Sequence, residues 1–234
     1  MKDWASNRLS FLKSISLWGT LGLLITHLLL ANFGEREQIW RLWTLVSLAF
    51  FFYFILIKQK TLLSRKYIFF SALIFRIPYI GQEPLLSDDF FRFFWDGELW
   101  ISGYNAYEWL PSAFVSKSQT VFSTELFYKL NSPNYYTVYP PLNQYLFIFA
   151  TYLSDSDVTQ FTTFLQIILL GIEMFILWII LKLSTNQLKF RPEIYYYNPL
   201  ICLEFTGNIH FEGLVVSQEK LNEKYPCIVI VWWR

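Results

Sequence analysis

The sequence predicts an all-α, polytopic membrane protein, and three observations support this fold class. Of the 234 residues, 54% are hydrophobic and 21% are aromatic, which is more apolar than an ordinary soluble domain. The apolar residues form blocks near the length that crosses a bilayer. Basic residues gather in the short segments between those blocks. We therefore expect a bundle of about five to six membrane helices with one long loop on the extracytoplasmic face.

The first three spans follow from these blocks and from the charges beside them. Spans are expected over about 15–32 and 41–57, followed by a shorter one at about 67–80. Because cytoplasmic segments are enriched in Lys and Arg, the third span is predicted to run outward. The basic residues that set this orientation are Lys2, Arg8, Lys13, Lys58, Lys60, Arg65 and Lys66.

A long outer loop is expected over about 81–138, where no apolar run is long enough to span. Loops of this size in compact proteins are usually functional. Within it, Ser87 is a candidate N-cap for an aromatic helix at about 88–100. The composition of that helix is typical of a segment lying in the membrane interface.

The carboxylate pair Asp88 and Asp89 opens this aromatic helix, and two interpretations of it stay open. Arg92 lies four and three residues further on, and Asp96 lies four residues beyond Arg92, so local ion pairs are expected on one face. The pair complements the helix dipole, or it serves a polar substrate as general base or as a ligand of Mg²⁺ or Mn²⁺.

Two further helices and a last span are expected after the outer loop. Pro140 and Pro141 stiffen the entry to an apolar stretch at about 142–154, which is expected to be interfacial or re-entrant. A span over about 161–181 then runs inward, since Lys182, Lys189 and Arg191 follow it. The last span, over about 194–215, is expected to bring Asn208 and His210 to the face of Asp88 and Asp89.

An ionisable residue inside a span needs a partner, and Glu173 is such a residue. Arg76, near the end of the third span, is one possible partner. After Val216 the sequence becomes polar and ends in a short apolar block, so we expect a domain over 1–216 and an aberrant tail over 217–234 that suggests a truncated coding region.

Other classes of function receive little support. The net charge is +1, which argues against a nucleic-acid partner. Cys202 and Cys227 form no zinc or redox motif.

Three segments in this order and spacing resemble one family. They are Ser87-Asp88-Asp89-x-x-Arg92-x-x-Trp95-Asp96-Gly97 with Gly103-x-Asn105-x-Tyr107; Val138-Tyr139-Pro140-Pro141-Leu142; and Tyr197-Asn198-Pro199-Leu200 with Glu204-Phe205-x-Gly207-Asn208-x-His210. From about Ile68 to Gly213 the chain resembles the N-terminal half of a GT-C-type glycosyltransferase, close to the polyprenol-phosphate-mannose-dependent mannosyltransferases. Relatives commonly have proline where Ala106 stands, and they continue with further spans.

The resemblance implies a membrane enzyme that moves a sugar, expected to be mannose, from a polyprenyl-phosphate donor to a lipid or glycan acceptor. Transfer would occur on the extracytoplasmic face of a bacterial plasma membrane, with inversion at the anomeric carbon. Asp88 and Asp89 occupy the place of the family's catalytic base, and either also serves as the metal ligand if a metal is used. The expected substrate-binding residues are Arg92, Trp95, Asp96, Asn105, Tyr139, Asn208 and His210.

Each of these roles has a structural alternative. Arg92 suits a carrier phosphate, yet it also suits an ion pair or a side chain that reaches from an interfacial helix to water. Trp95 packs on a sugar or belongs to the aromatic belt. For the whole chain, the alternatives are an inactive fragment of such an enzyme, or a transporter in which Arg76 and Glu173 line the path.

Overall fold

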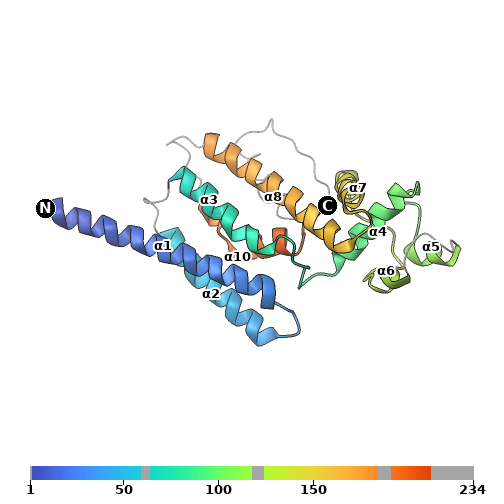
Figure 1. The fold of residues 1–234 in the computed structure, drawn as a ribbon, viewed down its shortest axis with the longest axis horizontal. Helices are drawn as coiled ribbons and strands as arrows, with labels where there is room; N and C mark the ends of the chain where they lie inside the picture. The colour runs from blue at the N-terminus through green and yellow to red at the C-terminus, as the bar shows by residue number, and fades with distance from the viewer. Residues whose placement is uncertain (1, 59–63, 118–123, 184–190, 212–234) are drawn as a thin grey trace. The chain divides into compact units, whose positions relative to one another are not determined.

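A computed structural model describes residues 2–58, 64–117, 124–183 and 191–211, and all secondary structure in these ranges is helical (Figure 1). The elements are α1 (Lys2–Phe33), α2 (Ile39–Lys58), α3 (Arg65–Arg76), η1 (Ile77–Tyr79), α4 (Asp89–Ile101), α5 (Pro111–Lys117), α6 (Thr124–Tyr128), α7 (Pro141–Ser154), α8 (Val158–Leu183), α9 (Pro192–Tyr196), α10 (Pro199–Ile201) and η2 (Cys202–Gly207). The tail expected over 217–234 lies outside the described residues. The predicted all-α class is confirmed.

The described residues form two compact units. The first contains residues up to 85 and the stretch 169–210, and the second contains 86–168 and Phe211. Three described helices are long and apolar enough to cross a membrane: Ser14–Phe33, Ile39–Lys58 and Val158–Leu183. They correspond to the first, second and fourth apolar stretches predicted as spans from the sequence.

The first unit is built on a close pair of helices, α1 and α2 (Figure 1). A Cβ added to Gly22 of α1 would lie 2.3 Å from the Phe52 ring of α2, so glycine permits this contact. On the other side, α2 exposes large apolar side chains such as Trp40 and Trp43, which are 84% and 62% exposed. An apolar face of this size is typical of a helix that contacts lipid.

Helix α3 packs against α1 and ends before it could cross a bilayer. Its N-cap is Ser64, whose Oγ accepts a hydrogen bond from the Tyr67 backbone N–H at 3.2 Å. At the other end, Pro78 lies in the 3₁₀ turn that follows Arg76. The third predicted span is therefore a 12-residue α-helix with a short 3₁₀ extension.

Arg76 and Glu173 form a buried ion pair that joins α3 to α8 inside the first unit. The Arg76 Nε donates to Glu173 Oε2 at 2.6 Å, and a second guanidinium nitrogen bonds the other carboxylate oxygen. Arg76 Nη1 donates to the carbonyl oxygens of Ala72 and Tyr196 at 2.8 and 2.9 Å. The partner predicted for Glu173 is confirmed.

The prediction of a continuous last span over about 194–215 is wrong for the described part of that segment. Here α9 ends near Tyr197, α10 begins after Asn198, and η2 is one turn of π-helix. Pro199 causes the break, because proline lacks an N–H and pushes the residue before it out of the helical region. Asn198 is extended (φ −62°, ψ 121°), and its side chain caps α10 by accepting from the Leu200 N–H at 3.0 Å.

In the second unit, α4 is largely buried and packs against α7. Phe93 of α4 stacks on Phe147 of α7 with ring centroids 4.7 Å apart. Helix α7 begins at Pro141, where a missing N–H costs nothing, and this confirms the expected role of the prolines at its entry. The predicted aromatic helix exists, and α4 begins one residue later than expected.

A glycine at the crossing sets how closely α4 approaches α7. A Cβ added to Gly97 would lie 2.1 Å from Thr151 Oγ1 and 2.9 Å from the Phe147 carbonyl oxygen. Gly171 of α8 has nothing within 4 Å of the same position.

We therefore expect Gly97→Ala to destabilise the protein by about 1–3 kcal/mol, because the two helices must move apart. Gly171→Ala should be neutral or stabilising by up to about 1 kcal/mol, since alanine is the better helix former. The thermal midpoint of the detergent-solubilised protein, followed by far-ultraviolet circular dichroism, measures both. Equal midpoints for the two variants would contradict the close contact.

Candidate functional site

The start of α4 places the two candidate carboxylates side by side at the edge of the second unit. Asp88 is the N-cap residue and Asp89 is the first helical residue, so the prediction of Ser87 as N-cap is wrong by one position. The Ser87 Oγ instead accepts a bond from the Asp89 N–H at 3.3 Å. Both carboxylates are partly exposed, and Asn131 Nδ2 donates to Asp89 Oδ1.

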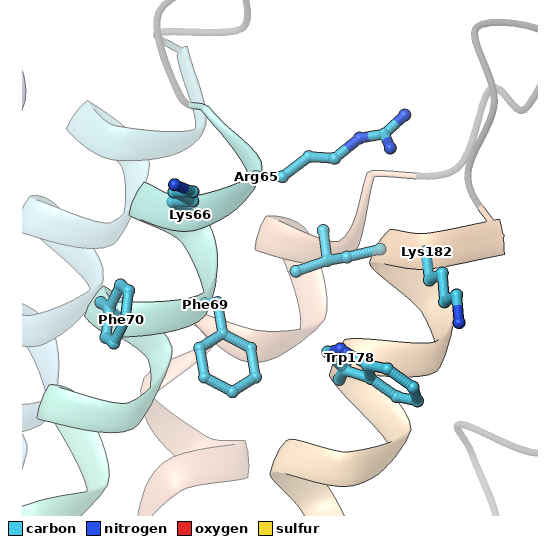
Figure 2. Close-up of a pocket in the computed structure, with 7 residues that line it drawn as sticks. Arg65, Lys66, Phe69, Phe70, Trp178 and Lys182 are labelled. Carbon is cyan, nitrogen blue, oxygen red and sulfur yellow. The ribbon is translucent and has the colours of Figure 1, made fainter.

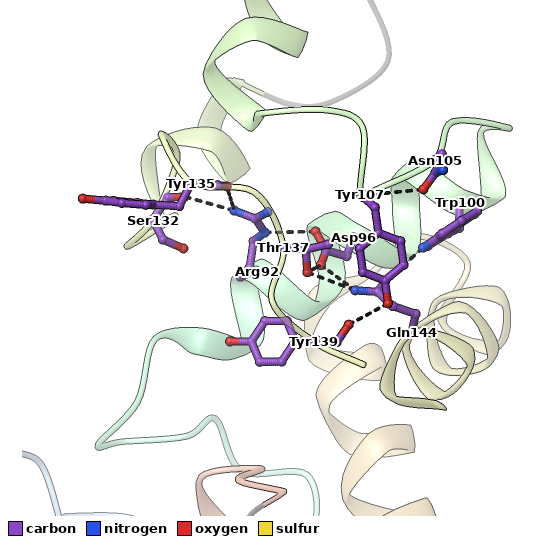
Figure 3. A network of polar contacts seen from close by, with 10 residues as sticks. All are labelled: Arg92, Asp96, Trp100, Asn105, Tyr107, Ser132, Tyr135, Thr137, Tyr139 and Gln144. Atoms are coloured by element: carbon purple, nitrogen blue, oxygen red, sulfur yellow. Dashed lines mark hydrogen bonds and ion pairs between the residues drawn. The ribbon is translucent and has the colours of Figure 1, made fainter. Parts of the chain in front are cut away.

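Behind this edge, Arg92 and Asp96 form a buried ion pair, with Arg92 Nε donating to Asp96 Oδ1 at 2.9 Å (Figure 3). The ion pair predicted from their spacing of four residues is confirmed. Arg92 Nη1 also donates to the carbonyl oxygens of Ser132 and Tyr135, each at 3.0 Å. Arg92 thus links α4 to the segment after α6 that contains Ser132 and Tyr135.

The other Asp96 oxygen is held from a different direction. Thr137 donates its hydroxyl to Asp96 Oδ2, and Gln144 Nε2 donates to the same oxygen at 2.9 Å (Figure 3). Trp100 Nε1 in turn donates to Gln144 Oε1 at 3.0 Å. We name the set Arg92, Asp96, Trp100, Thr137 and Gln144 the α4 network.

Burial raises the pKa of Asp96 above its ordinary value, while the Arg92 guanidinium and the hydrogen bonds from Thr137 and Gln144 act in the opposite direction. With every oxygen bonded, the carboxylate is well suited to hold the loop. Arg92 keeps one buried nitrogen, Nη2, that has no hydrogen-bond partner among the described residues. These contacts favour a positioning role for Arg92 and Asp96, and their predicted contact with substrate remains a prediction.

Asn105 and Tyr139 make hydrogen bonds and ring contacts with other residues of the second unit. The Asn105 Oδ1 accepts from the Tyr107 N–H at 3.0 Å (Figure 3). The Asn105 Nδ2 donates to Glu108 Oε1 at 2.8 Å. The Tyr107 hydroxyl donates to the Tyr139 carbonyl oxygen at 2.7 Å. The Tyr139 ring meets the Phe93 ring edge-on, 4.8 Å between centroids. Both predicted residues therefore contribute to the folding of the loop.

Trp95 is fully buried within the second unit, where its ring packs edge-on against Phe114 at 6.2 Å and near Phe127 at 6.2 Å. Aromatic packing of this kind is a normal core arrangement. The interfacial aromatic belt, one of its two predicted alternatives, is therefore wrong for Trp95, because its ring lies in the core of the second unit. Contact with a sugar stays a prediction.

Asn208 and His210 belong to the first unit. Asn208 is 1% exposed, and its backbone N–H donates to the Leu203 carbonyl oxygen at 2.8 Å. His210 Nδ1 lies 2.9 Å from Glu204 Oε2. Their expected proximity to Asp88 and Asp89 stays a prediction.

Four residues of the site were not predicted from the sequence: Trp100, Asn131, Thr137 and Gln144. Gln144 carries a usable signal, because it is a polar residue early in an otherwise apolar helix that follows two prolines. Asn131 and Thr137 lie in irregular segments, where no periodicity marks which side chains turn inward.

A cation at this site would depend on Asp88 and Asp89. Among the described residues, no group of three or more His, Cys, Asp or Glu side chains is placed to hold a metal ion. Mg²⁺ is often held by one or two carboxylates together with substrate phosphate oxygens, so this pair fits such an ion only with the donor phosphate present.

Comparison with known proteins gives one family. Residues 11–218 match the family model described as alpha-(1->6)-mannopyranosyltransferase, N-terminal domain. No curated protein and no solved structure matches the chain. The match includes the three segments that carried the resemblance and confirms it.

Proposed function

Since the chain belongs to the alpha-(1->6)-mannopyranosyltransferase family, we propose that it acts in the transfer of mannose from a polyprenyl-phosphate donor to a lipid or glycan acceptor on the extracytoplasmic face of a bacterial plasma membrane. The observation that carries this proposal is the Asp88–Asp89 pair. It lies partly exposed at the start of α4, where the α4 network and Asn131 hold the surrounding loop.

The proposed step is a displacement at the anomeric carbon of mannose. One carboxylate takes the proton of the acceptor hydroxyl as that oxygen bonds to the anomeric carbon. The bond from that carbon to the phosphate oxygen breaks, and the polyprenyl phosphate leaves with the electron pair. The 1->6 linkage in the family description suggests O6 of an acceptor sugar as the attacking oxygen. Attack opposite the leaving phosphate inverts the anomeric carbon.

Contacts around the pair suggest different tasks for its two members. Asn131 donates to Asp89 and thereby orients its carboxylate, an arrangement typical of a positioned base. Asp88 makes no side-chain capping bond to α4. We propose that one carboxylate is the base and that the other orients the acceptor or a cation.

The first test of this function is a transfer assay on membranes that contain the protein as its gene encodes it. Polyprenyl-phosphate mannose labelled in the sugar should pass its label to a mannose-terminated acceptor, and a 1,6-specific α-mannosidase should release it. Labelled GDP-mannose should give no product when polyprenyl phosphate is withheld. Direct transfer from the nucleotide sugar would contradict the proposed donor.

The second test concerns the face of the membrane. In a background without Cys202 and Cys227, Ser116→Cys should react with an impermeant thiol reagent on intact cells, because the second unit is proposed to lie outside. Ser64→Cys, at the start of α3, should react only after the membrane is opened. Labelling of position 64 and not of position 116 in intact cells would reverse the proposed topology.

The transporter alternative loses the observation that suggested it. Arg76 and Glu173 bond each other and the backbone in a closed, buried arrangement, with 0% and 2% of their surface exposed. Their charges are accounted for by this pairing inside the first unit.

A further inference from the structure

A groove lies between the first turns of α3 and the last turns of α8, within the first unit (Figure 2). Its volume is about 310 Å³, at the lower end of the range for small-ligand sites. Figure 2 shows Phe69 of α3 pointing into the space between the helices, with Trp178 and Lys182 on the facing side. The seven residues that line the groove are Arg65, Lys66, Phe69, Phe70, Trp178, Leu181 and Lys182.

Positive charge gathers at the mouth of this groove. Arg65, Lys66 and Lys182 all line it, and none of the seven lining residues is acidic. Two of these cations occupy the first turn of α3, where the helix dipole already presents its positive end. That placement is unfavourable for the isolated helix and becomes favourable when an anion binds there.

The remaining wall of the groove is apolar and accessible. Phe70 and Trp178 are 57% and 47% exposed, and Leu181, which also lines the groove, is buried. The Lys182 ammonium lies 4.9 Å from the centroid of the Trp178 ring, so the ring holds the cation at the edge of the apolar wall.

A general excess of Lys and Arg on the cytoplasmic side accounts for cations near these helix ends. It does not require three of them to converge on one groove with an aromatic wall. A basic entrance above an apolar wall at a membrane boundary matches the two parts of an anionic lipid. A free phosphate ion would use the cations and leave the wall unfilled.

We propose that this groove binds an anionic phospholipid, with the headgroup phosphate held by Arg65, Lys66 and Lys182 and an acyl chain lying along Phe69 and Trp178. The proposed topology places the groove at the cytoplasmic boundary, where anionic lipids attract basic segments. The Arg76–Glu173 pair ties together the same two helices that form its walls. Bound lipid would therefore bridge α3 and α8 at the end away from that pair.

Native mass spectrometry of the purified protein in detergent tests the site, with phosphatidylglycerol and phosphatidylcholine of identical acyl chains as probes. We expect retention of phosphatidylglycerol with at least tenfold higher affinity, since each cation near a lipid headgroup contributes about fivefold. The variant R65Q/K66Q/K182Q should lose this preference. The control R36Q/K117Q/K129Q removes the same net charge elsewhere and should keep it.

Two further measurements make the test decisive. If circular dichroism shows that the triple variant is unfolded, Lys66→Gln alone is used, with an expected loss of about fivefold. Glycerol 3-phosphate at millimolar concentration should not displace the lipid. Displacement by it, an unchanged preference in the folded groove variant, or an equal loss in the control variant would each overturn the proposal. These readouts do not depend on sugar transfer.

Discussion

Asp88→Asn and Asp89→Asn should have sharply different effects on mannose transfer. The variant that removes the base should lower turnover by about 10²- to 10⁴-fold, because no group then takes the acceptor proton. The other should lose about tenfold or less, since an amide still makes hydrogen bonds and orients the acceptor. Initial rates with labelled polyprenyl-phosphate mannose, at saturating and limiting acceptor, measure both variants.

Asn131→Ala identifies which carboxylate is the base. Because Asn131 donates to Asp89 Oδ1 and orients that carboxylate, this variant should lower turnover strongly only if Asp89 is the base. Asp155→Asn is the matched control: it removes an exposed carboxylate at the end of α7, within the same unit, and should leave the rate unchanged. Near-normal transfer by both Asp88→Asn and Asp89→Asn would show that the two carboxylates only complement the helix dipole.

Glu173→Gln should be among the most destabilising single substitutions in the chain. It leaves the Arg76 guanidinium charged and fully buried with a neutral partner, a change that costs about 3–5 kcal/mol. Arg76→Met should cost a similar amount, because it leaves the Glu173 carboxylate without its cation. The thermal midpoint of the detergent-solubilised protein should fall by about 6–20 °C in either variant.

The double variant R76M/E173M tests whether the loss comes from an uncompensated charge. It should recover most of the stability, since well-packed apolar side chains replace a buried ion pair at little cost. Glu35→Gln is the control: its partner is Arg41, the two side chains are 41% and 38% exposed, and the expected change is about 1 kcal/mol or less. Additive losses in the double variant would contradict direct coupling of Arg76 with Glu173.

The sequence by itself determined the features of this protein that depend on local composition and spacing. Three apolar blocks became α1, α2 and α8, because a bilayer requires a fixed length of apolar helix. Arg92 and Asp96 pair as their spacing of four residues predicts. Glu173 required a cation because an unpaired charge inside an apolar helix is costly, and Arg76 supplies it.

The family resemblance also rested on local order. Three short polar and aromatic segments, in a fixed succession along the chain, were enough to indicate a mannosyltransferase, and the family match covers them all. Such motifs are read along the chain and need no knowledge of which side chains meet.

Only the tertiary structure decided which helices continue and which polar groups meet. The apolar composition after residue 191 predicts one span, yet Pro199 and the cap at Asn198 divide it into short pieces that pack against α2 and α3. Thr137 and Gln144 reach Asp96 across 41 and 48 residues, and no periodicity records a contact between segments so far apart. For Trp95 the sequence left open a sugar contact or a place in the aromatic belt, and its position in the core follows from ring contacts of α4 with α5 and α6. Composition states how apolar a segment is, whereas the neighbours that fold against it decide whether lipid or protein covers it.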